Sequence, residues 1–543
     1  MPNPSGGDSL CVPRKPITYY VDPATPTWLV PWIERGIEEW QPAFEAAGFA
    51  RGIVAAEAPA NDPDFSGENA SVAMVRWVPS QVPNAVGPSV VDPRSGEILD
   101  ADVQLLQQVI GLLRGWYFVQ VGHLDPRAQK LPLPDSLMGR LVQNVVAHEV
   151  GHTLGFPHNT KASSLYPLDS IRSRTWVARM GHSPSIMDYA RFNYVAQPED
   201  RIDVNDLVPR LGPYDKYAVT WGYRPIPGAA TPEDEKPTLD RWARMQDTIP
   251  WYRFGGDAGA QIGVDPGEEY EAIGDADAVR ATGLGLRNLK RVAKLLEPAT
   301  TAVAGETYDD LQELYGTLVA QWVTELGHVT RIVGGAYKQE KVVGQKGGVY
   351  TPVSAARQRA AVAFLDEHAF RTPTWLIDPT LLRKFEASGS LDRIGAAQRN
   401  ILNQLLTNQR LNRMVELEAL ASRRGEEYTL AELLGDLRRG IWSELRTGAP
   451  VDAYRRRLQR AYVELLGQKV NPPAVNLPPG ASPQVSAMVA AASVADARAL
   501  LRGDLVALDR ERAAAVGRTA DRTTRLHLED VRVQVERILH PER

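Results

Sequence analysis

The chain has 543 residues, of which 43% are hydrophobic and 23% charged, so it has the composition of an ordinary soluble protein and the length of two or three domains. A net charge of -5, with no stretch that interleaves aromatic residues with a basic stripe, argues against a nucleic-acid partner. No apolar run approaches the roughly 20 residues that a helix needs to cross a bilayer, so no transmembrane segment is expected.

The first sixteen residues (1–16), MPNPSGGDSLCVPRKP, are rich in Pro, Gly and Ser and predict a leader or linker. They lack the apolar region of a signal peptide, so we expect the chain to be a piece of a longer precursor that is exported to the periplasm or the cell exterior. Cys11 is the one cysteine, which excludes an intramolecular disulfide. Its thiolate could block a metal ion, but an incidental thiol in a disordered leader is the preferred interpretation.

The next part of the chain predicts three strands and a helix. Thr27 is expected to cap the helix and Gly48 to end it. Apolar residues recur between them at helical spacing, namely Ile33, Ile37, Trp40 and Phe44. Runs rich in β-branched and aromatic residues predict strands at 17–21, 53–56 and 72–78.

The loop 59–70 is acidic and could bind calcium, but its spacing fits no EF-hand, so a solvated loop is preferred. Residues 86–91 and 97–105 flank the turn Asp92–Gly96, which is a hairpin-like signal.

Two helices are expected after this hairpin. The first is the apolar stretch 105–121. The second is expected to begin with Asp135 as its N-cap, a position where the carboxylate also suits the helix dipole. Its apolar stripe consists of Leu137, Leu141 and Val145.

The segment HEVGHTLGFPH continues this helix and is the strongest functional signal in the chain. His148 and His152 are four residues apart and so share one helix face, where two imidazoles can hold a single metal ion. Gly155 lets the backbone leave the helix, and the turn brings His158 back as a third nitrogen ligand. Glu149 can then reach water on the metal instead of the metal itself. Three ligands with one open position are typical of catalytic zinc, whereas structural zinc is closed by four. The alternative is a buried helix whose histidines hydrogen-bond locally.

A methionine-bearing turn, Ser185–Tyr189 with the sequence SIMDY, follows downstream and is of the kind expected beneath such a site. HEVGHTLGFPH followed by SIMDY resembles the metzincin clan of zinc endopeptidases, most closely the large bacterial zinc-dependent metalloproteases whose metzincin domain follows N-terminal domains of unknown function. The sharp motifs cover Asn144–Tyr189, and a looser likeness extends to about Pro225. Asn159, which follows the third histidine, is not typical of astacins, serralysins, adamalysins or matrixins, and this indicates a separate family.

The resemblance implies a role for each of these residues. Glu149 would be the general base, and Met187 would form an apolar floor beneath the metal. Tyr189 would ligate zinc at times and then swing away to hydrogen-bond the reaction's oxyanion. A protein or peptide substrate would bind extended along an edge strand within Val86–Asp102. The ligands of Zn²⁺ would be His148, His152 and His158.

Other residues near the motif have ordinary interpretations beside functional ones. His182 could contact substrate, but a hydrogen-bonded loop histidine is preferred. Arg172, Arg174 and Arg179 could bind a substrate carboxylate, but a solvated loop is the default. The arginines from Arg410 onward could mark an anionic partner, but acidic residues are interspersed, so solvated helix faces are preferred.

The rest of the chain predicts helices. Tyr217 and Trp221, four residues apart, suggest a short packed helix, and 226–280 is rich in Pro, Gly, Asp and Glu. Thr429 and Glu432 form a capping box. We therefore predict an α+β protein, in which a metzincin-like domain with a twisted mixed sheet and an active-site helix precedes a mainly α-helical C-terminal region. The expected segments are the leader 1–16, the zinc protease domain 17–225, an irregular connection 226–280, a helical domain with a β-hairpin 281–470, a Pro-rich linker 471–483 and C-terminal helices 484–543.

The sequence predicts a zinc-dependent endopeptidase with a metal-activated water and a glutamate base. One alternative is a catalytically silent pseudo-protease that binds zinc or peptides. Another is a helical scaffold with a vestigial protease domain. The sequence indicates no oligomeric state.

Overall fold

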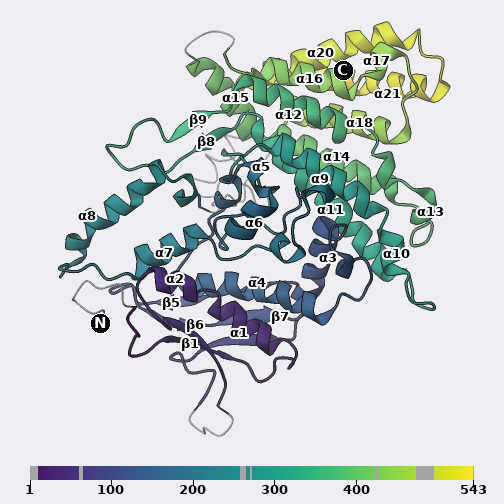
Figure 1. Ribbon diagram of the computed structural model, residues 1–543. Helices are drawn as coiled ribbons and strands as arrows, with labels where there is room; N and C mark the ends of the chain where they lie inside the picture. Colours follow the sequence, from purple (N-terminus) through teal and green to yellow (C-terminus); the bar gives the residue numbers. More distant parts are fainter. Residues whose placement is uncertain are drawn as a thin grey trace, which may run out of the picture. The chain divides into compact units, whose positions relative to one another are not determined.

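The computed structural model describes residues 10–59, 65–256, 264–268, 272–421, 426–472 and 495–541. The chain forms two compact units. The first contains Met1–Gly263, Gly267–Gln321 and Lys338–Val349, and the second contains Val264–Pro266, Trp322–Tyr337 and Tyr350–Arg543. Helices predominate and accompany a mixed five-stranded sheet, so the predicted α+β class is confirmed (Figure 1). Among the described residues, no helix is both long and apolar enough to span a membrane.

The five-stranded sheet belongs to the first unit and has the strand order β2-β1-β3-β7-β4. Neighbouring strands are parallel except for β4, which runs antiparallel to β7 and forms one edge. The three strands predicted first are confirmed to within one residue at either end. The five strands are β1 (Ile17–Val21), β2 (Ile53–Glu57), β3 (Ala73–Val78), β4 (Ala85–Val86) and β7 (Val103–Leu106).

The predicted hairpin forms a separate two-stranded ribbon of β5 (Ser89–Val91) and β6 (Ile98–Ala101). The ribbon is shorter than the predicted flanks 86–91 and 97–105, because Val86 belongs to β4 and 103–105 belong to β7. Its turn is closed by the Gly96 N–H, which donates to the Asp92 carbonyl at 2.8 Å. Gly96 has a φ of +75°, a conformation that glycine adopts without steric strain.

The helix predicted from Thr27 is divided into α1 (Val30–Glu38) and α2 (Gln41–Ala46). Pro42 explains the break, because its ring has no N–H to donate and would clash with the carbonyl one turn earlier. Thr27 is not the cap; that position is Leu29, and its side chain makes no capping hydrogen bond. The apolar residues expected on one face are nevertheless buried: Ile33, Ile37, Trp40 and Phe44.

The helix with the histidine motif is α4 (Asp135–Thr153), which packs beside α1 and against β4 and β7 (Figure 1). Pro134 is its N-cap, so Asp135 is the first helical residue and not the cap. Its carboxylate still lies in the first turn, where it favours the helix dipole. Trp40 donates from Nε1 to the Ala147 carbonyl at 2.7 Å, which ties α4 to the end of α1. The preceding helix, α3 (Val109–Val121), confirms the apolar helix predicted there.

The remaining helices of the first unit support the region after the motif. A buried cluster joins Tyr166, Tyr194 and Val195 to Ile273 and Leu284, so residues far beyond the motif complete this core. The segment predicted to be irregular contains a 12-residue helix, α8. Trp221 on α7 is 47% exposed, so the predicted packing of this side chain is wrong. These helices are α5 (Leu168–Ile171), α6 (Arg174–Met180), α7 (Pro213–Tyr223), α8 (Pro232–Ala243), α9 (Ala278–Ala293) and α10 (Leu296–Thr300).

The second unit is mainly helical, and its helices pack through buried apolar faces. Arg455 is buried there, and its guanidinium donates to the carbonyls of Gly440 and Ile441 at 3.0 and 2.7 Å. The capping box predicted at Thr429 and Glu432 is confirmed. Its helices are α12 (Ala355–His368), α13 (Pro379–Leu382), α14 (Ser390–Leu405), α15 (Asn408–Leu420), α16 (Leu430–Ile441), α17 (Glu444–Thr447), α18 (Ala453–Val470), α20 (Ala495–Val516) and α21 (Arg522–Leu539).

The chain passes from one unit to the other within or next to three elements. They are α11 (Asp309–Ile332), β8 (Ala336–Lys338) and β9 (Tyr350–Pro352). Two of them, β8 and β9, form the β-hairpin that was predicted within the helical domain. The predicted linker 471–483 lies outside the described residues from 473 onward, and the domain limits given above stay predictions.

Candidate metal centre and active site

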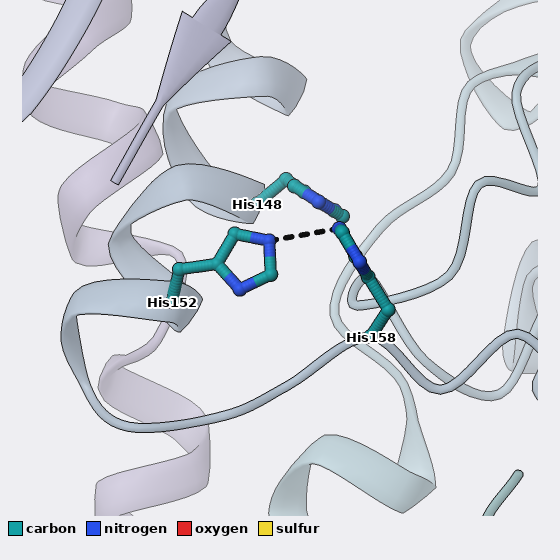
Figure 2. Close-up of side chains that lie close together, drawn as sticks. All are labelled: His148, His152 and His158. Carbon is teal, nitrogen blue, oxygen red and sulfur yellow. Dashed lines mark hydrogen bonds between the residues drawn. The ribbon is translucent and has the colours of Figure 1, made fainter. Parts of the chain in front are cut away.

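Three histidines come together at the C-terminal end of α4 (Figure 2). His148 and His152 project from the helix, and His158 comes from the loop that doubles back after it. One nitrogen atom from each ring lies within 4.8 Å of the other two. The Nε2 atoms of His152 and His158 are 2.9 Å apart. The fold thus brings together the three histidines that the sequence singles out as ligands.

The nitrogen atoms of this cluster suit a metal ion. The Nδ1 atoms of His148 and His152 lie 2.7 and 2.9 Å from the carbonyls of Ile186 and Phe156. Because a carbonyl can only accept, both Nδ1 atoms carry the proton and both Nε2 atoms present a lone pair. His148 Nε2 is buried and has no hydrogen-bond partner among the residues described. Burial also holds the pKa of His148 well below its usual value, which favours the neutral ring that binds metal.

The spacing of the ring nitrogens is close to what zinc requires. With Zn–N bonds of about 2.0 to 2.1 Å, tetrahedral geometry separates two ligand nitrogens by roughly 3.3 Å. The ring nitrogens are 2.9 to 4.8 Å apart. Side-chain rotations that move them by about an ångström would bring them to the separation that zinc requires. The cluster therefore fits a zinc ion with one coordination position open.

Gly155 allows the chain to turn back after the helix. Its φ is +91°, a left-handed conformation that strains any other residue. Its N–H donates to the His152 carbonyl at 2.9 Å, so the turn stays attached to the helix that it leaves.

Asn159 fixes the loop beyond the third histidine. Its backbone N–H donates to the Met187 carbonyl at 2.9 Å. Its side chain donates from Nδ2 to the Arg253 carbonyl at 3.1 Å and accepts the Gly255 N–H at 3.0 Å. The sequence gives no sign of this contact, because no local pattern links residues almost a hundred positions apart.

Met187 is buried against the helix that carries the first two histidines. A Cβ atom added to Gly151 would lie 2.1 Å from the sulfur of Met187 and 2.5 Å from Trp40. The glycine inside the HEVGH segment therefore makes room for both side chains. Met187 thus lies against the backbone of the helix between the two histidines.

Asp215 on α7 holds the turn that contains Met187. Its carboxylate accepts the Ser185 hydroxyl at 2.6 Å, the Ile186 N–H at 2.9 Å and the Gly212 N–H at 2.7 Å. Burial raises the pKa of Asp215 to about 7, and these three donors oppose the rise. One buried carboxylate thus connects α7 to the turn.

Glu149 lines a cavity of about 110 Å³ next to the histidines. Burial raises the pKa of its carboxyl to about 7, while the charge of Arg191 and the Gly87 N–H lower it. Gly87 follows the edge strand β4, and a Cβ atom there would lie 2.3 Å from the Glu149 carbonyl. Glycine therefore lets the edge approach the helix at this point. The apolar lining consists of Val109, Leu112, Leu113, Val145, Ile186 and Phe192.

Tyr189 lies beside two of the three histidine rings. Its ring centroid is 4.4 Å from that of His158 and 5.2 Å from that of His148. The Arg191 guanidinium carbon lies 4.5 Å from the centroid of the Tyr189 ring. The Tyr189 ring thus lies next to two of the three histidines, and the role that the resemblance implies for it stays a prediction.

The other candidates from the sequence have structural partners. His182 is buried and donates from Nε2 to the Arg191 carbonyl at 3.3 Å, which agrees with the preferred interpretation. Arg172 forms a bidentate pair with Asp200 at 2.8 and 2.9 Å, so it is not merely solvated. Arg179 lies with its guanidinium carbon 5.9 Å from the Trp176 ring.

Cys11 and the acidic loop lie apart from the motif in the sequence. The Cys11 backbone pairs with the end of α2, since its N–H donates to Gly48 at 2.9 Å and its carbonyl accepts from Ala50 at 3.0 Å. The interpretation of a disordered leader is therefore wrong at this residue. The acidic loop predicted at 59–70 falls partly outside the described residues, which resume at Phe65.

A mixed sheet and a helix whose histidines converge with a third on the following loop define a metalloprotease of the metzincin type. Residues 130–448, more than half of the chain, match the family model described as Met-zincin. The chain belongs to the Met-zincin family, whose members are zinc-binding proteases. Comparisons with curated proteins and with solved structures gave no match.

Proposed function

We propose that this chain is a zinc-dependent endopeptidase in which Glu149 is the general base. The observation that carries the proposal is the convergence of three imidazole nitrogens within 4.8 Å, next to a cavity that His148 and Glu149 both line. His148, His152 and His158 would hold the zinc ion. When bound, zinc supplies a Lewis acid that activates water and polarises the scissile carbonyl.

Glu149 moves the proton in this proposal. Its carboxylate accepts a proton from the attacking water and delivers it to the nitrogen of the leaving amine, so the residue ends the cycle as it began. A base works best when its pKa lies near the working pH, and burial raises the pKa of Glu149 to about 7. The Gly87 N–H is directed to the same carboxylate and helps to orient it.

Tyr189 would stabilise the oxyanion that forms on the carbonyl. The ring packs against His148 and His158, which keeps the Tyr189 side chain beside the proposed metal ligands. A hydroxyl held there can donate to the developing negative charge without reorganising first. Its assignment rests on this position and on the resemblance to relatives that carry a tyrosine two residues after the Met-turn methionine.

The substrate would lie along β4 as an extended strand. β4 ends the five-stranded sheet, so its outer side is available to backbone hydrogen bonds from a peptide. Gly87 connects this edge to Glu149, so a peptide paired with β4 would have its backbone beside the proposed base. Pairing through the backbone makes binding largely independent of side chains, as suits a peptidase acting on internal bonds.

The test uses the purified full-length chain, a peptide library analysed by mass spectrometry, and metal analysis. Glu149→Gln should keep one zinc ion per chain and lower cleavage at least about a thousandfold, whereas His152→Ala should lose both zinc and cleavage. Glu45→Gln, at an exposed position of α2, is the matched control and should cleave normally. Cleavage retained by Glu149→Gln would refute the proposed base. Wild-type protein that binds zinc without cleaving any peptide would favour the pseudo-protease instead.

A further inference from the structure

Arg191 lies between two aromatic rings at the wall of the Glu149 cavity. Its guanidinium carbon is 3.9 Å from the centroid of the Trp116 ring on α3 and 4.5 Å from that of Tyr189. Cations favour the faces of aromatic rings at such distances, and a planar guanidinium can stack on two rings at once. Trp116, Arg191 and Tyr189 thus form a layered stack.

The stack continues to the metal ligands. The Tyr189 ring is 5.2 Å from His148 at an interplanar angle of 28°, and 4.4 Å from His158. Tyr189 therefore has Arg191 against its ring as well as two of the histidines. The stack joins a helix outside the motif to the rings expected to bind zinc.

The backbone of Arg191 is held in an uncommon conformation. Its φ is +51°, in the left-handed region that residues with a Cβ rarely adopt. The buried His182 donates from Nε2 to its carbonyl at 3.3 Å, and the preceding residue, Ala190, is buried. Strained residues persist only where their surroundings hold them, and they gather at functional sites.

We propose that Arg191 and Trp116 are positioning residues for Tyr189: Arg191 contacts the Tyr189 ring and Trp116 holds Arg191 there, which keeps the ring beside the histidines. This inference rests on the proposed function, because it assumes that Tyr189 serves the oxyanion. If the Tyr189 ring moves away, it loses the cation–π contact with Arg191. The contact therefore favours the conformation in which the Tyr189 side chain stays near the reacting carbonyl.

Arg191→Met and Trp116→Leu remove the two outer layers one at a time. Each should lower kcat by about tenfold with little change in KM, because an interaction made only in the transition state affects kcat. Trp116→Phe keeps an aromatic face and should restore most of the loss. Arg35→Met is the matched control, since it removes a guanidinium 4.8 Å from Trp32 on α1 and should change nothing.

A double-mutant cycle decides whether the effect passes through Tyr189. In a Tyr189→Phe background, Arg191→Met should lower kcat much less than it does in the wild type. An equal loss in both backgrounds would overturn the proposal. Should Arg191→Met fail to fold, Trp116→Leu tests the same point and leaves Arg191 in place.

A spectroscopic arm separates this proposal from the proposed function. A fluorotyrosine placed at position 189 in the full chain reports the order of the ring by ¹⁹F NMR, with and without zinc and without any substrate. The resonance should be single and sharp in the wild type and in Trp116→Phe, and shifted and broadened in Arg191→Met. Unchanged resonances would overturn the positioning role, whereas the expected pattern in a chain that cleaves nothing would reject only the peptidase assignment.

Discussion

Gly151→Ala tests whether the helix of the motif depends on close packing by Met187. The added Cβ atom would lie 2.1 Å from the Met187 sulfur and 2.5 Å from Cζ2 of Trp40, both far inside van der Waals contact. The methionine is flexible and can move, but Trp40 is fixed by its bond to the Ala147 carbonyl at 2.7 Å. Overpacking of this kind costs about 1 to 3 kcal/mol, and the better helix propensity of alanine returns about 1 kcal/mol. We therefore expect a net loss of up to about 2 kcal/mol in the stability of α4.

Hydrogen exchange of the α4 amides, followed by mass spectrometry, measures this loss locally, which matters because a chain of two units need not unfold in one step. Zinc affinity, measured by competition with a chelator, should fall as well. Adding Met187→Ala to Gly151→Ala should recover part of the lost stability of α4, because the shorter side chain makes room for the new methyl group. Gly316→Ala is the control on the exposed face of α11, where nothing lies within 4 Å of the new methyl group. Unchanged exchange and unchanged zinc affinity in Gly151→Ala would refute the packing argument.

Two further predictions concern the supports of the site. Burial raises the pKa of Asp215 from 3.8 to about 7, so its ionisation opposes folding as the pH rises through that range. The free energy of unfolding of the wild type should therefore fall by up to about 4 kcal/mol between pH 4 and 8. Asp215→Asn cannot ionise and should not show this fall. The same difference in Tm between wild type and variant at pH 5 and at pH 8 would contradict this. Asn159→Ala removes two hydrogen bonds to Arg253 and Gly255 and should destabilise that contact by about 1 to 3 kcal/mol. Faster exchange of the Gly255 amide and weaker zinc binding are the expected readouts, and an unchanged Gly255 amide would show that the contact contributes nothing.

The predictions from sequence succeeded where the signal is local. β-Branched and aromatic content predicted the bounds of β1. The spacing of His148 and His152 placed both on one helix face, because helical periodicity is independent of the rest of the fold. Local chemistry also explains why the helix predicted from Thr27 is divided in two. The periodic pattern from Ile33 to Phe44 was correct about burial, but Pro42 breaks the hydrogen-bond ladder within it.

The predictions failed where a contact joins distant parts of the chain. Nothing near Asn159 indicates that its side chain binds the backbone at Arg253 and Gly255, and nothing near Glu149 indicates that Gly87 approaches it. Arg191 and Trp116 likewise belong to separate elements and carry no shared pattern. Such contacts arise from tertiary packing, which periodicity and capping rules do not describe.

The turn at Ser185–Met187 explains why the motif alone does not make the site. The Ile186 carbonyl holds His148, and the Met187 carbonyl holds the N–H of Asn159 beside the third histidine. The amide of Ile186 is in turn held by Asp215. A displacement of the turn would therefore move both His148 and the loop that carries His158, and precise sites tolerate shifts of only about 0.5 Å. The histidine spacing determines which nitrogen atoms could share a metal ion, whereas the turn and the buried carboxylate behind it hold those atoms close together.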